Sequence, residues 1–309
     1  MSKTALLFAG QGAQSVGMGK DLAEQFPTAK AWFDRANAAL GYDLATICFN
    51  GPDAELTKTE HAQPGIFLVS WVALQLLKER VPTLGFEAAA GLSLGEFTAL
   101  TAAGALSFEE GLRVVRQRGQ FMQDACEVTH GKMAAVIGLE EAPTREVCAA
   151  AGVVLANLNC PGQLVISGEA EKILVAVGLA KAKGARRALP LPVAGAYHSP
   201  LMASAQPKLR AELSKAKWSV PAVPVISNVT AQPHLNAETI AARLVEQVTS
   251  SVRWEESMRY LLAQGFTRFI ELGPGTALTG FMKRIDPGVQ MLNVADGGSL
   301  AATVNAIQG

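Results

Sequence analysis

The chain has 309 residues, 49% of them hydrophobic, and its 27 Lys and Arg residues balance its 27 Asp and Glu residues. This length allows a sizeable core, in one large domain or in one that carries a smaller inserted unit. Zero net charge gives no bulk attraction to nucleic acid or to membranes, so we expect neither as a partner.

The start of the chain and the cysteines indicate the compartment. The apolar run in MSKTALLFAGQGAQ is shorter than the core of a signal peptide, and no stretch is long enough to cross a bilayer. The four cysteines form no CxxC pair and no His/Cys ligand spacing. We therefore expect reduced, mostly buried thiols in a cytoplasmic protein, and no metal site.

The first part of the chain alternates strands and helices. Residues 4–10 (TALLFAG) have the character of a buried strand that ends in the turn GQGAQ, and helical patterns follow at about 21–40 and 66–80. Residues 86–93 (FEAAAGLS) form a second short strand, and residues 94–106 an apolar helix rich in small residues. This alternation predicts a parallel α/β sheet that is covered on both faces.

The middle of the chain changes to a β-α-β-β-α-β pattern, which is typical of a ferredoxin-like unit. Its strand runs lie at 132–139, 153–168 and 185–196, and its helices at 141–151 and 169–183. The α/β pattern then resumes with strands at 223–229, 266–275 and 289–294 and a helix at 236–249. We predict a ferredoxin-like subdomain (129–196) inserted into a larger α/β domain (1–128 and 197–309). That domain has a mostly parallel sheet in an α/β-hydrolase-like arrangement, and the crevice between the units is a natural ligand site.

Residues 91–97 (GLSLGEF) contain a Gly-x-Ser-x-Gly frame, which is typical of a serine nucleophile on a tight strand-to-helix turn. Such a serine needs a base for its proton and donors for the oxyanion that forms. The N–H of Leu94, at the start of the next helix, and that of Gln11, in the turn GQGAQ, are candidate donors. The alternative is that both turns are only tight connections.

A base must be one of four histidines, which are His61, His130, His198 and His234. His198, in LPVAGAYHSPLM, directly follows a predicted strand and has the most site-like setting, although a lone histidine is often structural or merely exposed. A Ser-His-acid hydrolase also needs an orienting acid after a strand. The only aspartate between Ser93 and His198 is Asp124, near the end of a helix, so no acid is evident. A Ser-Asp dyad with Asp296 is a further alternative, but we interpret its DGG as a surface turn.

The helix predicted at 107–125 begins with a capping box, Ser107 with Glu110, and carries an arginine on its apolar side. At about 100° per residue, Arg118 falls in the middle of the apolar arc, between Val114 and Met122. An arginine keeps its charge, so it needs an anion or a route to water. The partner is either an internal acid, water reached by snorkelling, or a ligand carboxylate held bidentately. A serine, a histidine and a recessed arginine together point to a dicarboxylic acyl thioester as substrate.

Six stretches, taken in order, resemble the malonyl-CoA:acyl carrier protein transacylase family. They are FAGQGAQSVGMGKDL, GLSLGE, VVRQRGQFMQDA, NCPGQLVISG, GAYHSPLM and FIELGPGTALTGFMKRI. The resemblance covers nearly the whole chain, and six ordered matches are far more specific than any one of them.

The resemblance implies roles for individual residues. Ser93 and His198 become a Ser-His dyad, with Ser93 as nucleophile and His198 as general base and acid. The backbone amides of Gln11 and Leu94 become the oxyanion hole. The family orients its histidine through a main-chain carbonyl in place of an aspartate, and the carbonyl of Gln247 in LVEQVTSS is the best match.

The resemblance also implies the substrate-binding residues, which are Arg118, Leu92, Met122 and Tyr197. Arg118 becomes the clamp for the malonyl carboxylate. Tyr197 resembles the aromatic residue of malonyl-selective relatives. Leu92 departs from the family, which has a histidine before the nucleophile, so a polar contact to the acyl group is lost there and a modest change in acyl positioning or rate is expected.

The implied reaction moves a malonyl group from malonyl-CoA to the phosphopantetheine thiol of acyl carrier protein, through an ester on Ser93, for fatty acid synthesis. No cofactor is needed, and we expect a monomer. The alternatives are a trans-acting polyketide acyltransferase, an esterase or thioesterase that uses the same serine, and a carrier-binding module that has lost catalysis. Carrier protein is acidic, so a basic surface is expected, although such residues can also be only a solvated face. The candidates are Lys181, Lys183, Arg186, Arg187, Lys283 and Arg284.

Overall fold

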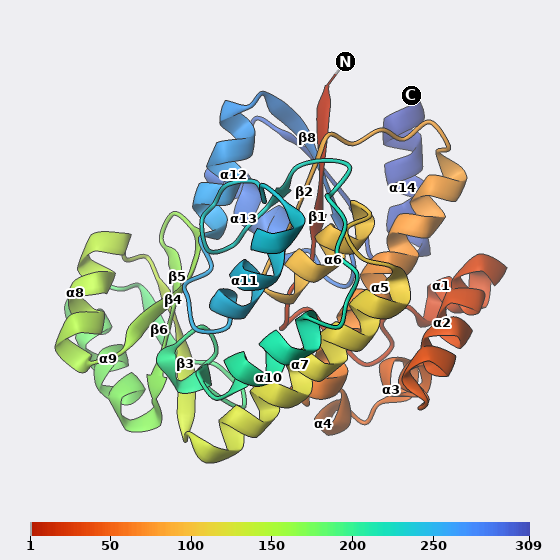
Figure 1. The fold of residues 1–309 in the computed structure, drawn as a ribbon. Coiled ribbons are helices and arrows are strands. Elements are labelled where there is room, and N and C mark those ends of the chain that lie inside the picture. The colour runs from red at the N-terminus through yellow and green to blue at the C-terminus, as the bar shows by residue number, and fades with distance from the viewer. Residues whose placement is uncertain (1) are drawn as a thin grey trace.

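The computed structural model describes residues 2–309 and contains two sheets (Figure 1). The larger sheet has five parallel strands in the order β7-β2-β1-β8-β9, and the smaller has four antiparallel strands in the order β4-β5-β3-β6. The strands are β1 (Lys3–Phe8), β2 (Ala88–Gly91), β3 (Gly131–Ile137), β4 (Val154–Cys160), β5 (Gln163–Glu169), β6 (Arg187–Pro190), β7 (Val225–Ile226), β8 (Phe266–Leu272) and β9 (Gln290–Val294). The chain therefore has an α/β fold with a parallel sheet and a separate antiparallel sheet.

Helices surround both sheets. They are α1 (Lys20–Gln25), α2 (Pro27–Leu40), α3 (Leu44–Asn50), α4 (Asp53–Leu56), α5 (Thr59–Arg80), α6 (Leu94–Ala102), α7 (Phe108–Val128), α8 (Glu141–Ala151), α9 (Ala170–Ala182), α10 (Ala205–Leu213), α11 (Ala237–Gln247), α12 (Trp254–Ala263), α13 (Ala277–Ile285) and α14 (Gly297–Gln308), with a 3₁₀ turn at Pro200–Met202. The helix predicted at 141–151 is α8, whereas the pattern predicted at 21–40 is split at Phe26, where α1 ends and Pro27 begins α2. Proline is favoured in the first helical turn, where its missing N–H is not needed.

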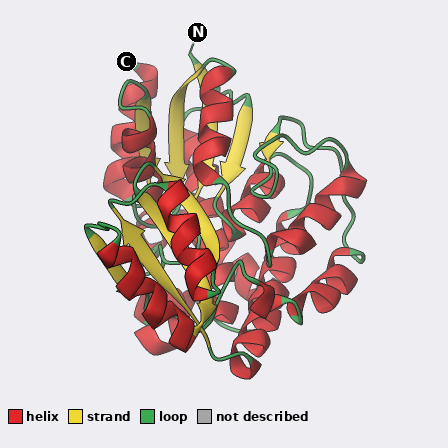
Figure 2. Ribbon diagram, turned by 90° about the vertical axis from the view of Figure 1, so that its left-hand side faces the viewer, coloured by secondary structure: helices red, strands yellow, loops and turns green. Residues whose placement is uncertain are grey.

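The parallel sheet is buried on both faces, as an all-parallel sheet must be (Figure 2). Leu6 and Phe8 of β1 point into a core shared with α5 and α6, while Ala5 and Leu7 point into a second core shared with α12 and α13. Successive strand residues face opposite sides, so this split follows from the period of two.

The antiparallel sheet has its own core, to which α8 and α9 contribute. Its edge strand β4 is joined to the larger unit by backbone hydrogen bonds to Val252, whose N–H donates to the carbonyl of Ala156 (2.8 Å) and whose carbonyl accepts from Leu158 (2.9 Å). The predicted strand at 185–196 is shorter in the structure, since β6 covers only Arg187–Pro190. The rest of that run is loop and leads to His198.

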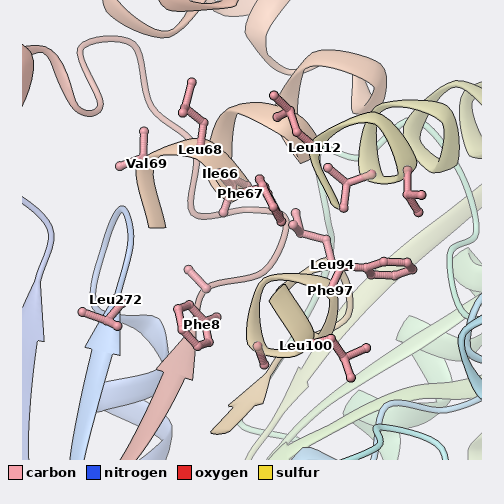
Figure 3. Close-up of a cluster of buried hydrophobic side chains, with 14 of the residues drawn as sticks. Phe8, Ile66, Phe67, Leu68, Val69, Leu94, Phe97, Leu100, Leu112 and Leu272 are labelled. Carbon is pink, nitrogen blue, oxygen red and sulfur yellow. The ribbon is translucent and has the colours of Figure 1, made fainter. Parts of the chain in front are cut away.

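The connection from β2 to α6 is the tightest turn that bears on the site. A Cβ added to Gly91 would lie 1.9 Å from the carbonyl of Gly95, and one added to Gly95 would lie 2.3 Å from the carbonyl of Phe8. Both glycines of the Gly-x-Ser-x-Gly frame are therefore required by close backbone approach. In Figure 3 the apolar side chains of α6, Leu94 and Phe97 among them, gather with those of α5 and with Phe8 at the end of β1.

We expect Gly91→Ala to lower the free energy of unfolding by about 3 kcal/mol or more, because the added methyl must displace backbone. Gly178→Ala is the matched control: it lies inside α9 with nothing within 4 Å of the added Cβ, and should stabilise by about 0.5–1 kcal/mol. Urea unfolding measures both. Equal stability of the two variants would contradict the close approach at the serine turn.

Candidate active site

Ser93 lies between β2 and the first turn of α6, with φ 55° and ψ −105°. A positive φ is strained for a residue with a side chain, so neighbours must hold it. Asn228 does so from both sides: its Oδ1 accepts from the N–H of Ser93 (2.6 Å), and its Nδ2 donates to the carbonyl of Gly91 (2.8 Å). The serine side chain is only 7% exposed.

His198 lies in the loop after β6, is buried, and also has a positive φ of 57°. Its Nε2 is 2.9 Å from Ser93 Oγ, and its Nδ1 is 2.9 Å from the main-chain carbonyl of Gln247. A carbonyl can only accept, so the neutral imidazole carries its proton on Nδ1 and its Nε2 accepts from the serine hydroxyl. The partner of Nδ1 is thus a peptide oxygen, at the place where a hydrolase has a carboxylate.

The surroundings of His198 favour its neutral form. Burial, followed by the nearby Arg118 charge, lowers the pKa of His198 to about 4, although the hydrogen bond to the Gln247 carbonyl acts in the opposite direction. Both main causes penalise the imidazolium. At neutral pH the ring is therefore able to accept a proton.

Arg118 comes from the middle of α7 and is 1% exposed. Its Nη2 donates to Ser93 Oγ (3.0 Å) and to Gln247 Oε1 (2.9 Å), and its Nη1 donates to Gln63 Oε1 (2.6 Å). All three acceptors are neutral, and no ion pair to Arg118 is present within residues 2–309. An internal acid as direct partner and snorkelling to water are both wrong here. Burial lowers the pKa of Arg118 to about 10, so the guanidinium is still charged at neutral pH.

The two candidate oxyanion donors lie on adjacent turns. Strands β1 and β2 pair in parallel with Phe8 opposite Gly91, so the turns that hold Gln11 and Leu94 leave the same edge of the sheet. The turns touch, since a Cβ on Gly10 would lie 2.5 Å from the carbonyl of Leu92. Within the described part of the chain, no hydrogen bond occupies the N–H of Gln11 or of Leu94. Both remain available to a ligand oxygen.

The remaining predicted residues lie around these groups. The Leu92 side chain packs against Gly10, since its Cδ2 is 2.7 Å from the position of an added Cβ there. Met122 Sδ lies 3.6 Å from the amide nitrogen of Gln63. Tyr197 is 5% exposed, and burial raises its pKa, with Gln11, Cys126 and Thr59 near its hydroxyl.

Several polar residues of the site were missed by sequence reasoning. Glu96, Asn228 and Gln63 are all buried and all hydrogen-bonded to site residues. The signal for Glu96 was present, because it is a lone acid in a helix of apolar and small residues. Asp296, considered as a dyad partner, instead caps α14 through Ser299.

The structure also locates the other groups that the sequence singled out. Across residues 2–309 no helix is both long and apolar enough to span a membrane. In the same residues no group of three or more His, Cys, Asp or Glu side chains is placed to hold a metal ion. The six basic candidates are exposed, although Lys183 pairs with Glu146 (2.5 Å) and Arg284 donates to Gln163 (3.0 Å).

We expect the reaction of Ser93 with phenylmethylsulfonyl fluoride to fall at acidic pH with a midpoint near 4, well below 6.5. The rate requires neutral His198, and its pKa of about 4 means that the ring loses its proton as the pH rises through 4 and is neutral near pH 7. His198→Gln is the control, which should react about 100-fold more slowly at neutral pH and show no such titration. A midpoint between 6 and 7 would contradict the assigned environment.

The chain is similar along its length to known acyl transferases. The family model of the acyl transferase domain matches residues 5–297. The malonyl CoA-acyl carrier protein transacylase of Bacillus subtilis (strain 168) is 44% identical over 313 residues, covering 100% of this chain and 98% of the relative. The solved malonyl CoA-acyl carrier protein transacylase of Coxiella burnetii superposes with a TM-score of 0.96 at 36% identity, covering 100% of this chain and 98% of that one.

A further solved structure contains a partner. A malonyl-transacylase in complex with a type II PKS acyl-carrier protein superposes with a TM-score of 0.95 at 37% identity, covering 99% of this chain and 100% of that chain. These matches cover nearly the whole length of this chain and of each of the three relatives. The chain therefore belongs to the acyl transferase family and, within it, to the malonyl CoA-acyl carrier protein transacylases.

Proposed function

We propose that this chain transfers the malonyl group of malonyl-CoA to the phosphopantetheine thiol of acyl carrier protein, through an ester on Ser93. The observation that carries the proposal is Arg118, a buried guanidinium whose Nη2 lies 3.0 Å from Ser93 Oγ and whose partners are all neutral. A donor that brings its own carboxylate supplies the missing negative charge. The names of the full-length relatives agree with this substrate.

In the first half-reaction, His198 Nε2 takes the hydroxyl proton while Ser93 Oγ attacks the thioester carbonyl. The N–H groups of Gln11 and Leu94 stabilise the oxyanion, and the carbonyl of Gln247 stabilises the imidazolium through Nδ1–H. The C–S bond then breaks, and the CoA sulfur leaves with the proton from His198. Malonyl remains as an ester on Ser93.

The second half-reaction reverses these roles. Neutral His198 takes the proton of the phosphopantetheine thiol, the sulfur attacks the ester, and the proton returns to Ser93 Oγ as the C–O bond breaks. Ser93 and His198 thus act as a dyad in both directions, and no cofactor enters either step. The solved relative with a type II PKS carrier supports acyl carrier protein as the acceptor class, and it keeps polyketide synthesis open beside fatty acid synthesis.

The domain organisation that we infer has a hydrolase-like unit at 1–128 and 197–309 and a ferredoxin-like subdomain at 129–196. Two observations support the second unit, namely the antiparallel order β4-β5-β3-β6 and the separate core under α8 and α9.

We infer further that the protein acts as a monomer. The dyad and the clamp all come from one chain, so no second copy is needed to complete the site.

The malonyl-enzyme should be detectable directly. Incubation with malonyl-CoA should add one malonyl group to the intact mass, and Ser93→Ala should show none, because Ser93 Oγ lies beside both the base and the candidate oxyanion donors. Addition of phosphopantetheinylated carrier protein should remove the adduct as malonyl-carrier. Free malonate as the main product would favour an esterase or thioesterase, and an unmodified wild type would favour a carrier-binding module.

Arg118→Gln should lower kcat/KM for malonyl-CoA by about 100-fold or more, because a charge-assisted bidentate pair is lost. The same variant should not lose activity toward acetyl-CoA, since acetyl has no carboxylate. Competition between the two donors, measured for wild type and variant, gives the preference directly. A variant that still prefers malonyl over acetyl would show that Arg118 is not the clamp.

Acidic carrier protein should dock on the basic candidates near the smaller sheet. Reversing Arg186 and Arg187 to Glu should slow transfer to carrier and flatten its dependence on salt, because screened long-range attraction sets the association rate. Transfer of malonyl from CoA to Ser93 should be unchanged and serves as the internal control. An unaltered salt dependence would remove these two residues from the docking surface.

A further inference from the structure

Behind Ser93 lies a buried carboxylate with no part in the reaction described above. Glu96, in the first turn of α6, is 0% exposed. Its Oε1 lies 2.8 Å from His234 Nε2, and its Oε2 accepts from the N–H of Asn228 (2.9 Å) and from the side-chain amide of Gln247 (2.7 Å). Both oxygens are therefore engaged, and a buried carboxylate with this many partners is expected to have a fixed place.

One of those partners, Gln247, contacts Ser93, His198 and Arg118. Its main-chain carbonyl accepts from His198 Nδ1 (2.9 Å). Its side-chain Nε2 donates to the carbonyl of Ser93 (3.0 Å), and its Oε1 accepts from Arg118 Nη2 (2.9 Å). The sequence indicated only the main-chain carbonyl, so the side chain has a second and separate set of contacts.

The orientation of this amide has a chemical cause. An amide has one end that only donates and one that only accepts, and the two ends are similar in shape. Two acceptors, Ser93 O and Glu96 Oε2, surround the nitrogen end, while a donor, Arg118, faces the oxygen end. A turned amide would set NH₂ against the guanidinium and oxygen against the carboxylate. Glu96 makes that alternative costly, because its charge rejects the oxygen end.

We propose that Glu96 is a positioning residue for the acyl-donor clamp: it fixes the side-chain amide of Gln247 so that the amide oxygen holds the Arg118 guanidinium beside Ser93. This inference rests on the proposed function, since the clamp matters only for a donor with a carboxylate. Glu96 acts through Gln247 and touches neither substrate nor reacting atoms. Its charge also compensates the buried guanidinium at longer range, and it raises the pKa of Arg118 against the larger effect of burial.

The second amide on Arg118 gives a matched comparison. Gln63 Oε1 accepts from Nη1 (2.6 Å), but the Gln63 nitrogen donates to Thr59 Oγ1 (3.0 Å) and, within residues 2–309, makes no hydrogen bond to Glu96. Both glutamines therefore support the guanidinium, and only one is held by Glu96. Methionine at either position keeps the approximate size of the side chain and removes the amide, and at residue 247 it leaves the main-chain carbonyl for His198.

The test is a pair of double-mutant cycles on KM and kcat for malonyl-CoA. Gln247→Met should raise KM about tenfold, as expected for losing a hydrogen bond to a charged group, and change the sulfonylation rate of Ser93 far less. Glu96→Met should raise KM as well, but far less in the Gln247→Met background than in the wild type, because only its longer-range charge effect on Arg118 remains there. Combined with Gln63→Met, its effect should be much closer to additive, because Gln63 is linked to Glu96 only through the shared guanidinium.

Additive effects of Glu96→Met and Gln247→Met on KM would overturn the inference, and so would a loss confined to kcat or to sulfonylation. If Glu96→Met does not fold, Glu96→Gln replaces it. That variant can present either end of an amide to Gln247, and it should raise KM far more in the wild type than in Gln247→Met. A wild type that forms no malonyl adduct would instead overturn the proposed function, whatever the cycles show.

Discussion

The site depends on one buried charge, that of Arg118, which has no direct counter-ion. Arg118 is brought under the serine turn by the apolar face of α7, and its hydrogen-bond partners there are two amides and a hydroxyl. Removing a guanidinium from water without a direct counter-ion is costly, so the fold must supply that free energy from packing elsewhere. The large core around α5, α6 and α7 does this. The result is a buried cation at which a bound anion would restore the electrostatic stabilisation that burial removed.

The turn around Ser93 has a strained backbone, which hydrogen bonds from its neighbours hold in place. Ser93 has a backbone conformation that side chains avoid. Only glycine fits at 91 and 95, because residue 91 lies against the backbone of Gly95 and residue 95 against the carbonyl of Phe8. Asn228, from the loop after β7, closes the turn by accepting from Ser93 and donating to Gly91. The same asparagine is bound by Glu96. Ser93 and Arg118 thus share one buried polar network, which explains how a rigid geometry is kept for both.

Local sequence patterns were enough to predict much of the secondary structure and one residue of the site. The capping box of Ser107 with Glu110, the helix at 141–151 and the recessed position of Arg118 all follow from short-range chemistry and helical period, and the structure contains each of them. What could not be predicted was which residues meet across long separations. Asn228 is 135 positions from Ser93, and Gln247 is 129 from Arg118. Such pairs are set by the order of strands in the sheet, which no local pattern specifies, and for Gln247 only family resemblance pointed to the main-chain half of its role.

The low pKa of His198 has a consequence for how the proposed reaction is timed. Burial and the Arg118 charge together oppose protonation of the ring, so in the empty site His198 is neutral but a weak base. A bound malonyl carboxylate neutralises the guanidinium and removes the second of these two causes. The pKa of His198 then rises while the donor is in place, which moves it toward the value at which a general base works best. In this scheme the contact between Arg118 and the malonyl carboxylate has two effects. It selects the donor, and it raises the basicity of His198 only while that donor is bound. An uncharged acyl donor obtains neither effect.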